Sequence, residues 1–128
     1  MILLDTHAWL WLTSDSARLS DAARAAAETA DRIGVCTISC WEIGMLVTAG
    51  RIRIDRDARL WMRQALLAER LEAIPLTAEI AISAALLPEG FPGDPADRII
   101  YAAALDLGAR LVTKDRRIRS FDPQRALW

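Results

Sequence analysis

Four short apolar runs, at residues 2–5, 33–38, 71–76 and 110–113, constrain the fold of this chain more than any other feature. They are rich in Ile, Leu and Val, and turn or helix signals bound each of them. Apolar runs of this length without polar alternation are typical of strands that are covered on both faces. We therefore expect a sheet that is buried between layers of helices.

The stretches between these runs are rich in Ala and Arg and carry helix signals. Ser20 and Thr77 each open a helical stretch, and Gly50 and Gly108 each end one. We expect helices over residues 20–30, 39–49, 55–69, 77–87 and 94–107. The alternation of strands and helices predicts a single-domain α/β/α sandwich with a mainly parallel central sheet, to which residues 126–128 can add an edge strand.

The composition excludes several classes of protein. The 128 residues suit one domain, and a hydrophobic fraction of 53% predicts a packed core. No apolar run approaches the roughly 20 residues that span a bilayer, and no secretory signal is recognisable, so we expect the chain in the cytoplasm. Its one histidine, His7, and its two cysteines, Cys36 and Cys40, are too few for the usual zinc sites.

Acidic residues stand where several of the expected strands end. Asp5 ends the first apolar run, and Asp115 closely follows the last. Glu42 comes shortly after the second run, while Asp94 and Asp97 stand at the start of the last long helix. In an open parallel sheet, ligands bind beyond the carboxyl ends of the strands. These acids are therefore candidates for one shared site.

Each acid also has a purely structural interpretation. Ser39 and Glu42 have the spacing of a capping box, in which two side chains satisfy the first amides of a helix. Asp94 matches an N-cap that is followed by Pro95, and Asp115 can start a turn. For any one acid taken alone, the structural interpretation is the stronger of the two.

Taken together, the acids point to a metal site. Several carboxylates on one edge would repel one another unless a cation lay between them. Oxygen ligands without His or Cys favour the small hard cations Mg²⁺ and Mn²⁺, which can activate water and stabilise the leaving oxygen in phosphodiester cleavage. Basic side chains stand in two clusters, at 51–56 and 114–119. They are candidates for holding phosphates, although either cluster alone can equally be solvated surface charge.

Four motifs in order along the chain resemble those of PIN-domain ribonucleases and, more narrowly, of the VapC-type toxins of toxin–antitoxin pairs. They are the hydrophobic-Asp-Thr start at 2–6, Trp-Glu at 41–42, Asp-Pro-x-Asp-Arg at 94–98 and Leu-Val-Thr-x-Asp at 111–115. The resemblance covers the whole chain, residues 1–128. It implies a PIN-like sheet in the order 3-2-1-4-5 and an endoribonuclease that depends on Mg²⁺ or Mn²⁺.

The resemblance also implies roles for individual residues. Asp5 and Asp97 would be the principal metal ligands, and Glu42 and Asp115 would complete the catalytic cluster, with Asp94 as the helix cap. The residues that would contact the RNA substrate are Thr113, Lys114, Arg98 and Arg116. The chain departs from the family pattern at Pro92, where relatives often carry a histidine.

Tryptophans suggest a surface for a partner. Trp9 and Trp11 are two positions apart on a short helix, so their side chains point about 200° apart. Trp61 stands in the apolar run 60–62, which is wider than one buried stripe. Either these helices are buried on two sides, or Trp11 and Trp61 form an exposed patch. An exposed patch would suit the partners that the resemblance implies, a VapB-type antitoxin and a second copy of this chain.

Two other folds that handle phosphate are excluded, and one other function stays open. A phosphorylation receiver domain needs an aspartate after the third strand, where this chain has residues 74–77, Ile-Pro-Leu-Thr. A phosphatase with an Asp-x-Asp motif is excluded because His7 occupies the second position. The alternative that remains is a PIN-like module that has lost catalysis and only binds. Intact acids at all four positions count against it.

Overall fold

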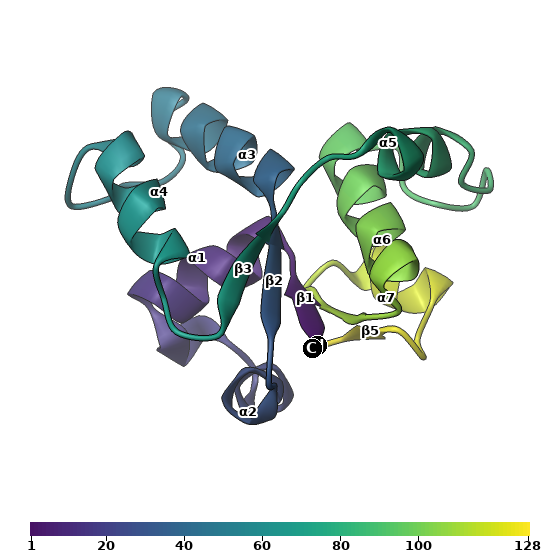
Figure 1. The fold of residues 1–128 in the computed structure, drawn as a ribbon, viewed down its shortest axis with the longest axis horizontal. Helices are drawn as coiled ribbons and strands as arrows, with labels where there is room; N and C mark the ends of the chain where they lie inside the picture. Colours follow the sequence, from purple (N-terminus) through teal and green to yellow (C-terminus); the bar gives the residue numbers. More distant parts are fainter.

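The chain folds around one sheet of five parallel strands, and the computed structural model describes all residues from 1 to 128 (Figure 1). The strands are β1 (Ile2–Leu4), β2 (Ile33–Cys36), β3 (Leu71–Ile74), β4 (Arg110–Val112) and β5 (Ala126–Leu127). They lie in the order β3-β2-β1-β4-β5, with every neighbouring pair parallel. This confirms the expected order 3-2-1-4-5 and places β1 at the centre of the sheet.

Helices connect the strands. They are α1 (Thr6–Ser14), α2 (Asp21–Thr29), α3 (Thr37–Thr48), α4 (Ala58–Leu66), α5 (Ala78–Ala85), α6 (Pro95–Leu107) and α7 (Arg116–Phe121), with a short 3-10 turn at Ser16–Arg18. Five of them match the expected helical stretches, with ends shifted by a few residues. The sequence pattern does not reveal α7, because its six residues are too few to show an apolar stripe. No helix combines the length and apolarity needed to cross a bilayer.

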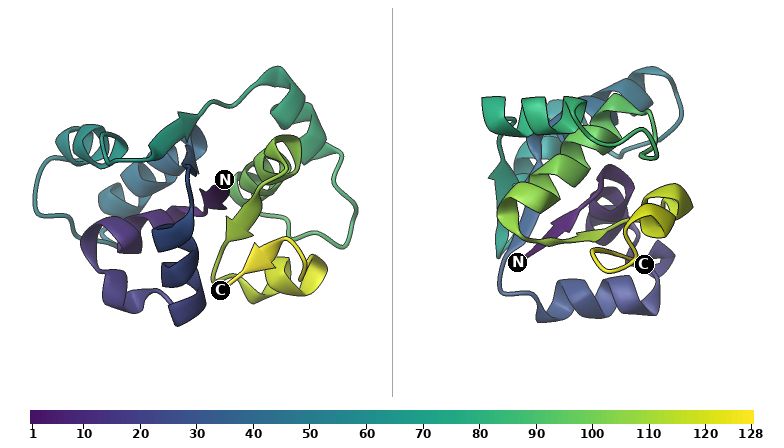
Figure 2. Two further views of the ribbon diagram at one scale, coloured as in Figure 1. Left: turned by 60° about the horizontal axis from the view of Figure 1, so that its bottom comes forward. Right: turned by 90° about the vertical axis from the view of Figure 1, so that its right-hand side faces the viewer.

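The sheet divides the hydrophobic core into two parts, because successive side chains of a strand point to opposite faces. Ile2 and Leu4 of β1 pack on the face that α1, α2, α3 and α4 cover. Leu3 packs on the other face, together with side chains of α5, α6 and α7. Figures 1 and 2 show these two layers on either side of the strands. Both faces of the central strand are buried, as its uninterrupted apolar sequence predicts.

The tryptophans of α1 and α4 are buried, so the expected exposed patch at Trp11 and Trp61 is wrong. Trp11 is 8% exposed and Trp61 is 4% exposed. The Trp9 and Trp61 rings lie 5.1 Å apart between their helices, and Trp11 packs against Trp128 at 5.7 Å. The reason is that α1 is covered on two sides, by the sheet on one and by α4 and the C-terminal residue on the other.

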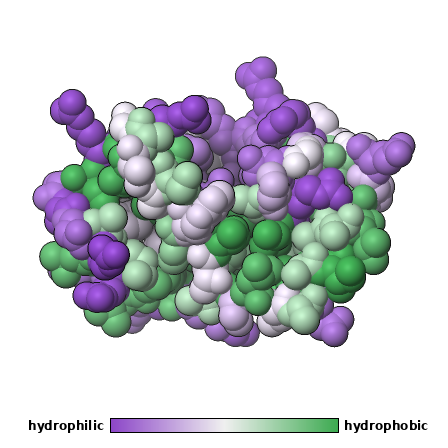
Figure 3. All heavy atoms as spheres, turned by 90° about the horizontal axis from the view of Figure 1, so that it is seen from above, coloured by the Kyte–Doolittle hydropathy of each residue, from purple (hydrophilic) through white to green (hydrophobic).

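The large apolar side chains that are exposed lie elsewhere. Trp41 and Met45 on α3 are 59% and 51% exposed, and they border a hollow of about 390 Å³ between α3 and α4. Ile82 and Leu86, at α5, are also exposed. Seen from above, apolar and hydrophilic side chains are gathered in separate patches of the surface (Figure 3).

Arg98 holds the end of α5. Its guanidinium donates hydrogen bonds to the carbonyl groups of Ala84 at 3.1 Å, Ala85 at 3.4 Å and Leu87 at 3.3 Å. The carbonyls of Ala84 and Ala85 belong to the last turn of α5, where a helix leaves its acceptors without partners, and Leu87 directly follows the C-cap. The side chain is therefore committed to the fold, and the expected contact between Arg98 and RNA does not fit its position.

We expect Arg98→Met to lower the free energy of unfolding by about 1–2 kcal/mol, because the carbonyl groups at the end of α5 lose their donor while the aliphatic stem is kept. Urea denaturation followed by circular dichroism measures the change. Arg110→Met is the matched control, since Arg110 is exposed, and it should shift stability by less than about 0.5 kcal/mol. Equal stability of the two variants would show that the Arg98 hydrogen bonds contribute nothing.

Candidate active site

The register of the central strands brings Asp5 and Thr113 to one edge of the sheet. Leu4 of β1 pairs with Val35 of β2 on one side and with Val112 of β4 on the other. The next residue of β1 is Asp5, whose backbone N–H still donates to the carbonyl of Val112 at 3.0 Å. Thr113 directly follows Val112, so Asp5 and Thr113 lie side by side where the strands end.

Asp5 is the N-cap of α1. One of its carboxylate oxygens, Oδ1, accepts a hydrogen bond from the Ala8 N–H at 2.8 Å. Burial raises the pKa of the Asp5 carboxyl above its ordinary value, while hydrogen bonds from Thr113 and Ala8 oppose the rise. The Thr113 hydroxyl also accepts from the Asp115 N–H at 3.1 Å, so this fully buried threonine links two of the acids.

Glu42 is not part of a capping box, which corrects the structural interpretation of Ser39 and Glu42. The helix α3 begins at Thr37, two residues before the expected start, and its N-cap Cys36 makes no side-chain hydrogen bond. Glu42 therefore lies in the second turn, where its carboxylate accepts from the Thr6 hydroxyl. Burial raises the pKa of Glu42, and the hydrogen bond from Thr6 opposes the rise.

Asp94 and Asp97 stand at the start of α6 with different tasks. Asp94 is the N-cap and accepts from the Asp97 N–H at 3.1 Å, with Pro95 at the first helical position. This confirms the expected cap. The carboxyl of Asp97 has its pKa raised to about 7, first by burial and then by the negative charges of Asp94, Glu42, Asp115 and Asp5.

Asp115 is the N-cap of α7 rather than the start of an isolated turn. It accepts from the Arg117 N–H at 2.8 Å and forms an ion pair with the Arg117 guanidinium at 2.9 Å. These contacts lower the pKa of the Asp115 carboxyl. Asp115 is thus the most readily ionised of the four acids, because the pKa values of Asp5, Glu42 and Asp97 are all raised.

The four acids line one hollow of about 740 Å³, although they come from four separate segments of the chain. Lys114 and Arg116, two of the expected RNA contacts, lie on the same wall, and Arg98 does not. The other residues of the hollow are Thr6, His7, Trp11, Leu46, Arg51 and Asp94. The negative charges that raise the pKa of Asp97 are those of its neighbours here, so the carboxylates act on one another across the hollow.

Comparison with known proteins gives the family. The model of the PIN domain matches residues 2–122. The chain belongs to the PIN-domain family. Among its relatives, "Ribonuclease VapC22" of Mycobacterium tuberculosis (strain ATCC 25618 / H37Rv) is 45% identical over 119 residues, which cover 93% of this PIN domain and 90% of that protein. This similarity identifies the chain as a PIN-domain protein of the VapC type.

Solved structures share the fold of this PIN domain. A toxin-antitoxin complex from Klebsiella pneumoniae contains a chain with a TM-score of 0.70 and 19% identity, over 100% of this chain and 97% of that one. VapBC2 from Rickettsia felis, bound to a DNA fragment from its promoter, gives a TM-score of 0.67 and 18% identity, over 99% and 98%. At such identities the likeness concerns the fold alone.

The structure adds Thr6 and Ser39 to the site residues of this PIN domain. Both are buried, their hydroxyl oxygens lie 2.9 Å apart, and Thr6 donates to Glu42. Thr6 belongs to the hydrophobic-Asp-Thr motif, which is the signal in the sequence that could have marked it as a site residue. The sequence does not show which residue its hydroxyl would bind. Its partner is 36 residues away, on a helix that only the fold brings close.

The chemistry of the acids suits a hard cation, since the hollow offers carboxylate oxygens and no thiolate. In the structure, no three of its His, Cys, Asp or Glu side chains converge as a ready-made ligand set. Three of the acids have an oxygen engaged elsewhere: Asp5 with Ala8, Glu42 with Thr6, and Asp115 with Arg117. An ion bound here would therefore have to draw some carboxylates together, which its charge favours by offsetting their repulsion.

The raised pKa of Asp97 predicts how stability depends on pH in metal-free protein. Below about pH 4, Asp97 is protonated in both the folded and the unfolded chain, so burial of the group costs nothing. Between about pH 4 and 7 the unfolded chain ionises first, and the penalty grows until it is complete above the folded pKa of about 7. The stability associated with the neutral group is thus lost as pH rises.

We expect Asp97→Asn to raise the free energy of unfolding by roughly 1–2 kcal/mol at about pH 8, after allowance for partial exposure of the group, and by little at about pH 4. Denaturant titrations in chelator at both pH values measure this. Asp106→Asn is the matched control, because Asp106 is an exposed residue of the same helix. A gain that is the same at both pH values, or that the control shares, would refute the assignment.

Proposed function

We propose that this PIN domain is a metal-dependent endoribonuclease and the toxin of a toxin–antitoxin pair. The observation that carries the proposal is that Asp5, Glu42, Asp97 and Asp115 line one hollow that also has basic side chains on its wall. The 45% identical relative that is named a ribonuclease supports the same activity. The reaction would be the hydrolysis of phosphodiester bonds in RNA.

Mg²⁺ or Mn²⁺ is the cofactor that suits this set of oxygen ligands. Asp5 and Asp97 would hold it most directly, and Glu42 and Asp115 would complete the set. When bound, such an ion supplies an activated water and stabilises charge on the leaving oxygen.

Other side chains would position the acids and the substrate. Thr6 orients Glu42, and Thr113 connects Asp5 with Asp115. Thr113 has no exposed surface, so it cannot contact RNA as expected. Its proposed role is instead to position the carboxylates. Lys114 and Arg116 are exposed on the wall of the hollow, where they can bind phosphate oxygens.

A PIN-like module that binds without cleaving is the alternative. Such a module would have no need to keep four acids in a partly buried hollow, where burial and mutual repulsion raise the pKa of Asp5, Glu42 and Asp97. Clusters of this kind destabilise a fold and are typical of functional sites. The structure therefore favours the enzyme.

We expect Asp5→Asn and Glu42→Gln each to reduce cleavage of single-stranded RNA by at least about 100-fold, because each removes a charge from the reacting centre while preserving shape. In Glu42→Gln, the amide oxygen of the new side chain could still accept the hydrogen bond from Thr6. Pooled cellular RNA with Mg²⁺, with and without chelator, is the assay, and mapping of the new ends identifies the cleaved sequences. Asp106→Asn is again the control. Full activity of both variants, in preparations free of contaminating nuclease, would rule out this mechanism.

A VapB-type antitoxin is the protein partner that we propose. The structural neighbours include a toxin-antitoxin complex and a VapBC complex. On this chain, the exposed Trp41 and Met45 beside the hollow between α3 and α4 offer an apolar surface of the kind that receives an amphipathic helix. Arginines from the antitoxin could pair with Asp5 and Asp97 in place of the metal, which would explain inhibition. A homodimer and a cytoplasmic location remain predictions.

Substitutions at this apolar surface test the interface. Trp41→Ser and Met45→Ser are expected to weaken antitoxin binding by about tenfold or more while leaving the fold intact, because both side chains are largely exposed. Titration calorimetry against the protein that the adjacent gene encodes gives the affinity, with Leu105→Ser on α6 as the control. Trp11 and Trp61 are unsuitable for this test, since both are buried. Unchanged affinity in both variants would place the interface elsewhere.

A further inference from the structure

A second hollow, of about 490 Å³, adjoins the acidic one along α1. The two share His7, Trp11 and Arg51, so they form one continuous depression. We name the second hollow the α1 groove and define it by these three residues together with Arg18 and Arg53. It begins beside the acids and leads away from them.

The arginine side chains of the α1 groove have no carboxylate partner. Arg18, Arg51 and Arg53 are exposed, and none of them forms an ion pair or donates a side-chain hydrogen bond. Asp15 is the single carboxylate that lines the groove together with these three cations. On the adjoining wall of the acidic hollow, the ammonium of Lys114 also has no carboxylate partner.

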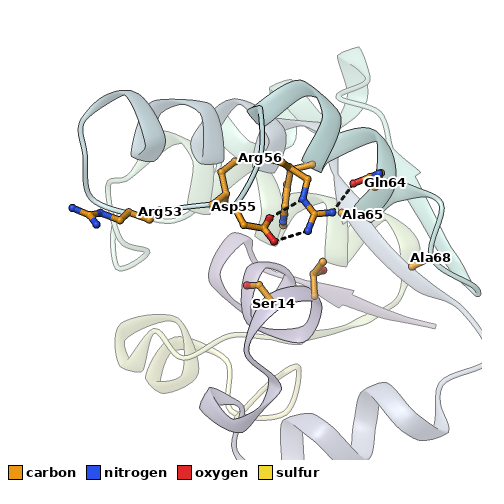
Figure 4. Close-up of a pocket in the computed structure, with 10 residues that line it drawn as sticks. Ser14, Arg53, Asp55, Arg56, Gln64, Ala65 and Ala68 are labelled. Carbon is orange, nitrogen blue, oxygen red and sulfur yellow. Dashed lines mark hydrogen bonds and ion pairs between the residues drawn. The ribbon is translucent and has the colours of Figure 1, made fainter.

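Many other arginines of the chain are engaged in holding the fold. A third hollow shares Ser14 and Arg53 with the α1 groove. Figure 4 shows Arg56 of this third hollow bound to both oxygens of Asp55, at 2.7 and 2.8 Å, and to Gln64. Arg53 is drawn in the same view with its guanidinium extended away from that cluster. Four arginines outside the α1 groove also lack ion pairs and side-chain hydrogen bonds. One is Arg116 at the acidic hollow, and the others are Arg59, Arg63 and Arg110. Free cations are thus concentrated along one path that ends at the acids.

An aromatic platform lies where the two hollows meet. The His7 ring is exposed and lies 5.5 Å from the ring of Trp11, centre to centre. The Arg18 guanidinium stands 4.8 Å from the Trp11 ring centre and the Lys114 ammonium 5.3 Å from it. Trp128 packs on Trp11 and keeps it in place. An unstacked base could rest on the imidazole of His7 while its phosphates meet the cations around it.

We infer that the α1 groove binds the single-stranded segment of RNA that continues from the scissile phosphate. The inference rests on the proposed ribonuclease function and extends it by giving the substrate its path: phosphates along Arg51, Arg18 and Arg53, and one base on His7. A cationic groove with an aromatic surface is the combination that serves single strands, since a duplex keeps its bases stacked inside. The chain as a whole has a net charge of −1, so this groove supplies locally an attraction that the bulk charge does not.

The test compares two charge-matched double variants. Arg18→Gln with Arg53→Gln removes charge from the α1 groove, and Arg63→Gln with Arg110→Gln removes the same charge outside it. Fluorescence anisotropy with a labelled single-stranded RNA of about 20 nucleotides, in chelator so that no cleavage occurs, gives the affinity over a range of salt concentrations. The groove variant should bind roughly tenfold more weakly at low salt, with a plot of log K against log salt that is shallower by about 1.4, while the control matches the wild type.

The outcomes separate this inference from the proposed catalysis. Equal affinities and equal salt slopes for the two double variants would overturn the inference that the α1 groove binds RNA, whether or not the protein cleaves RNA. A loss confined to the groove variant would support it even if the wild type proved unable to cleave. A duplex RNA of the same length should bind the wild type at least about tenfold more weakly than the single strand. Equal binding of duplex and single strand would overturn the assignment to single-stranded RNA.

Discussion

The parallel pairing of β1 with both of its neighbours is the constraint on which the rest of the structure depends. This strand has only three residues, yet it lies at the centre of the sheet and is buried on both faces. Because its partners run in the same direction, all three strands end at one edge, and the residues that follow them meet there. The helices α1 and α7 begin at this edge, and their first N–H groups donate to the carboxylates of Asp5 and Asp115, where a helix N-terminus favours negative charge.

Hydrogen bonds and one ion pair make the concentration of acids tolerable. Asp5 accepts hydrogen bonds from the Ala8 N–H and the Thr113 hydroxyl, and Glu42 accepts one from the Thr6 hydroxyl. Asp115 forms an ion pair with Arg117. Asp97 has burial and like charge without such a donor, which is why its pKa rises to about 7. The acids therefore differ in how readily they ionise, although they share one hollow. This difference comes from their separate partners rather than from their common chemistry.

Some basic side chains stabilise helix ends, and others lie exposed on the surface beside the acids. Arg98 binds the last carbonyls of α5, and Arg70 reaches the carbonyls at the end of α2. Both stabilise helix ends that would otherwise lack donors. The arginines of the α1 groove make no such contacts and stay available to a ligand. A nearly neutral chain can in this way present a local excess of either sign.

The sequence by itself determined the strands, most helices, the sheet order through its family resemblance, and the acids that line the hollow. These features depend on local signals, such as apolar runs, N-caps like Asp94 and stops like Gly108, or on motifs that survive as short strings. Tertiary structure alone decided that α1 is covered on two sides, that Arg98 serves a helix end, and that Glu42 pairs with Thr6 instead of capping α3. Each of these depends on a partner far away in the chain. A pattern of neighbouring residues cannot specify which distant group will satisfy a buried hydrogen bond or cover an apolar face, because packing of the whole chain brings the two together.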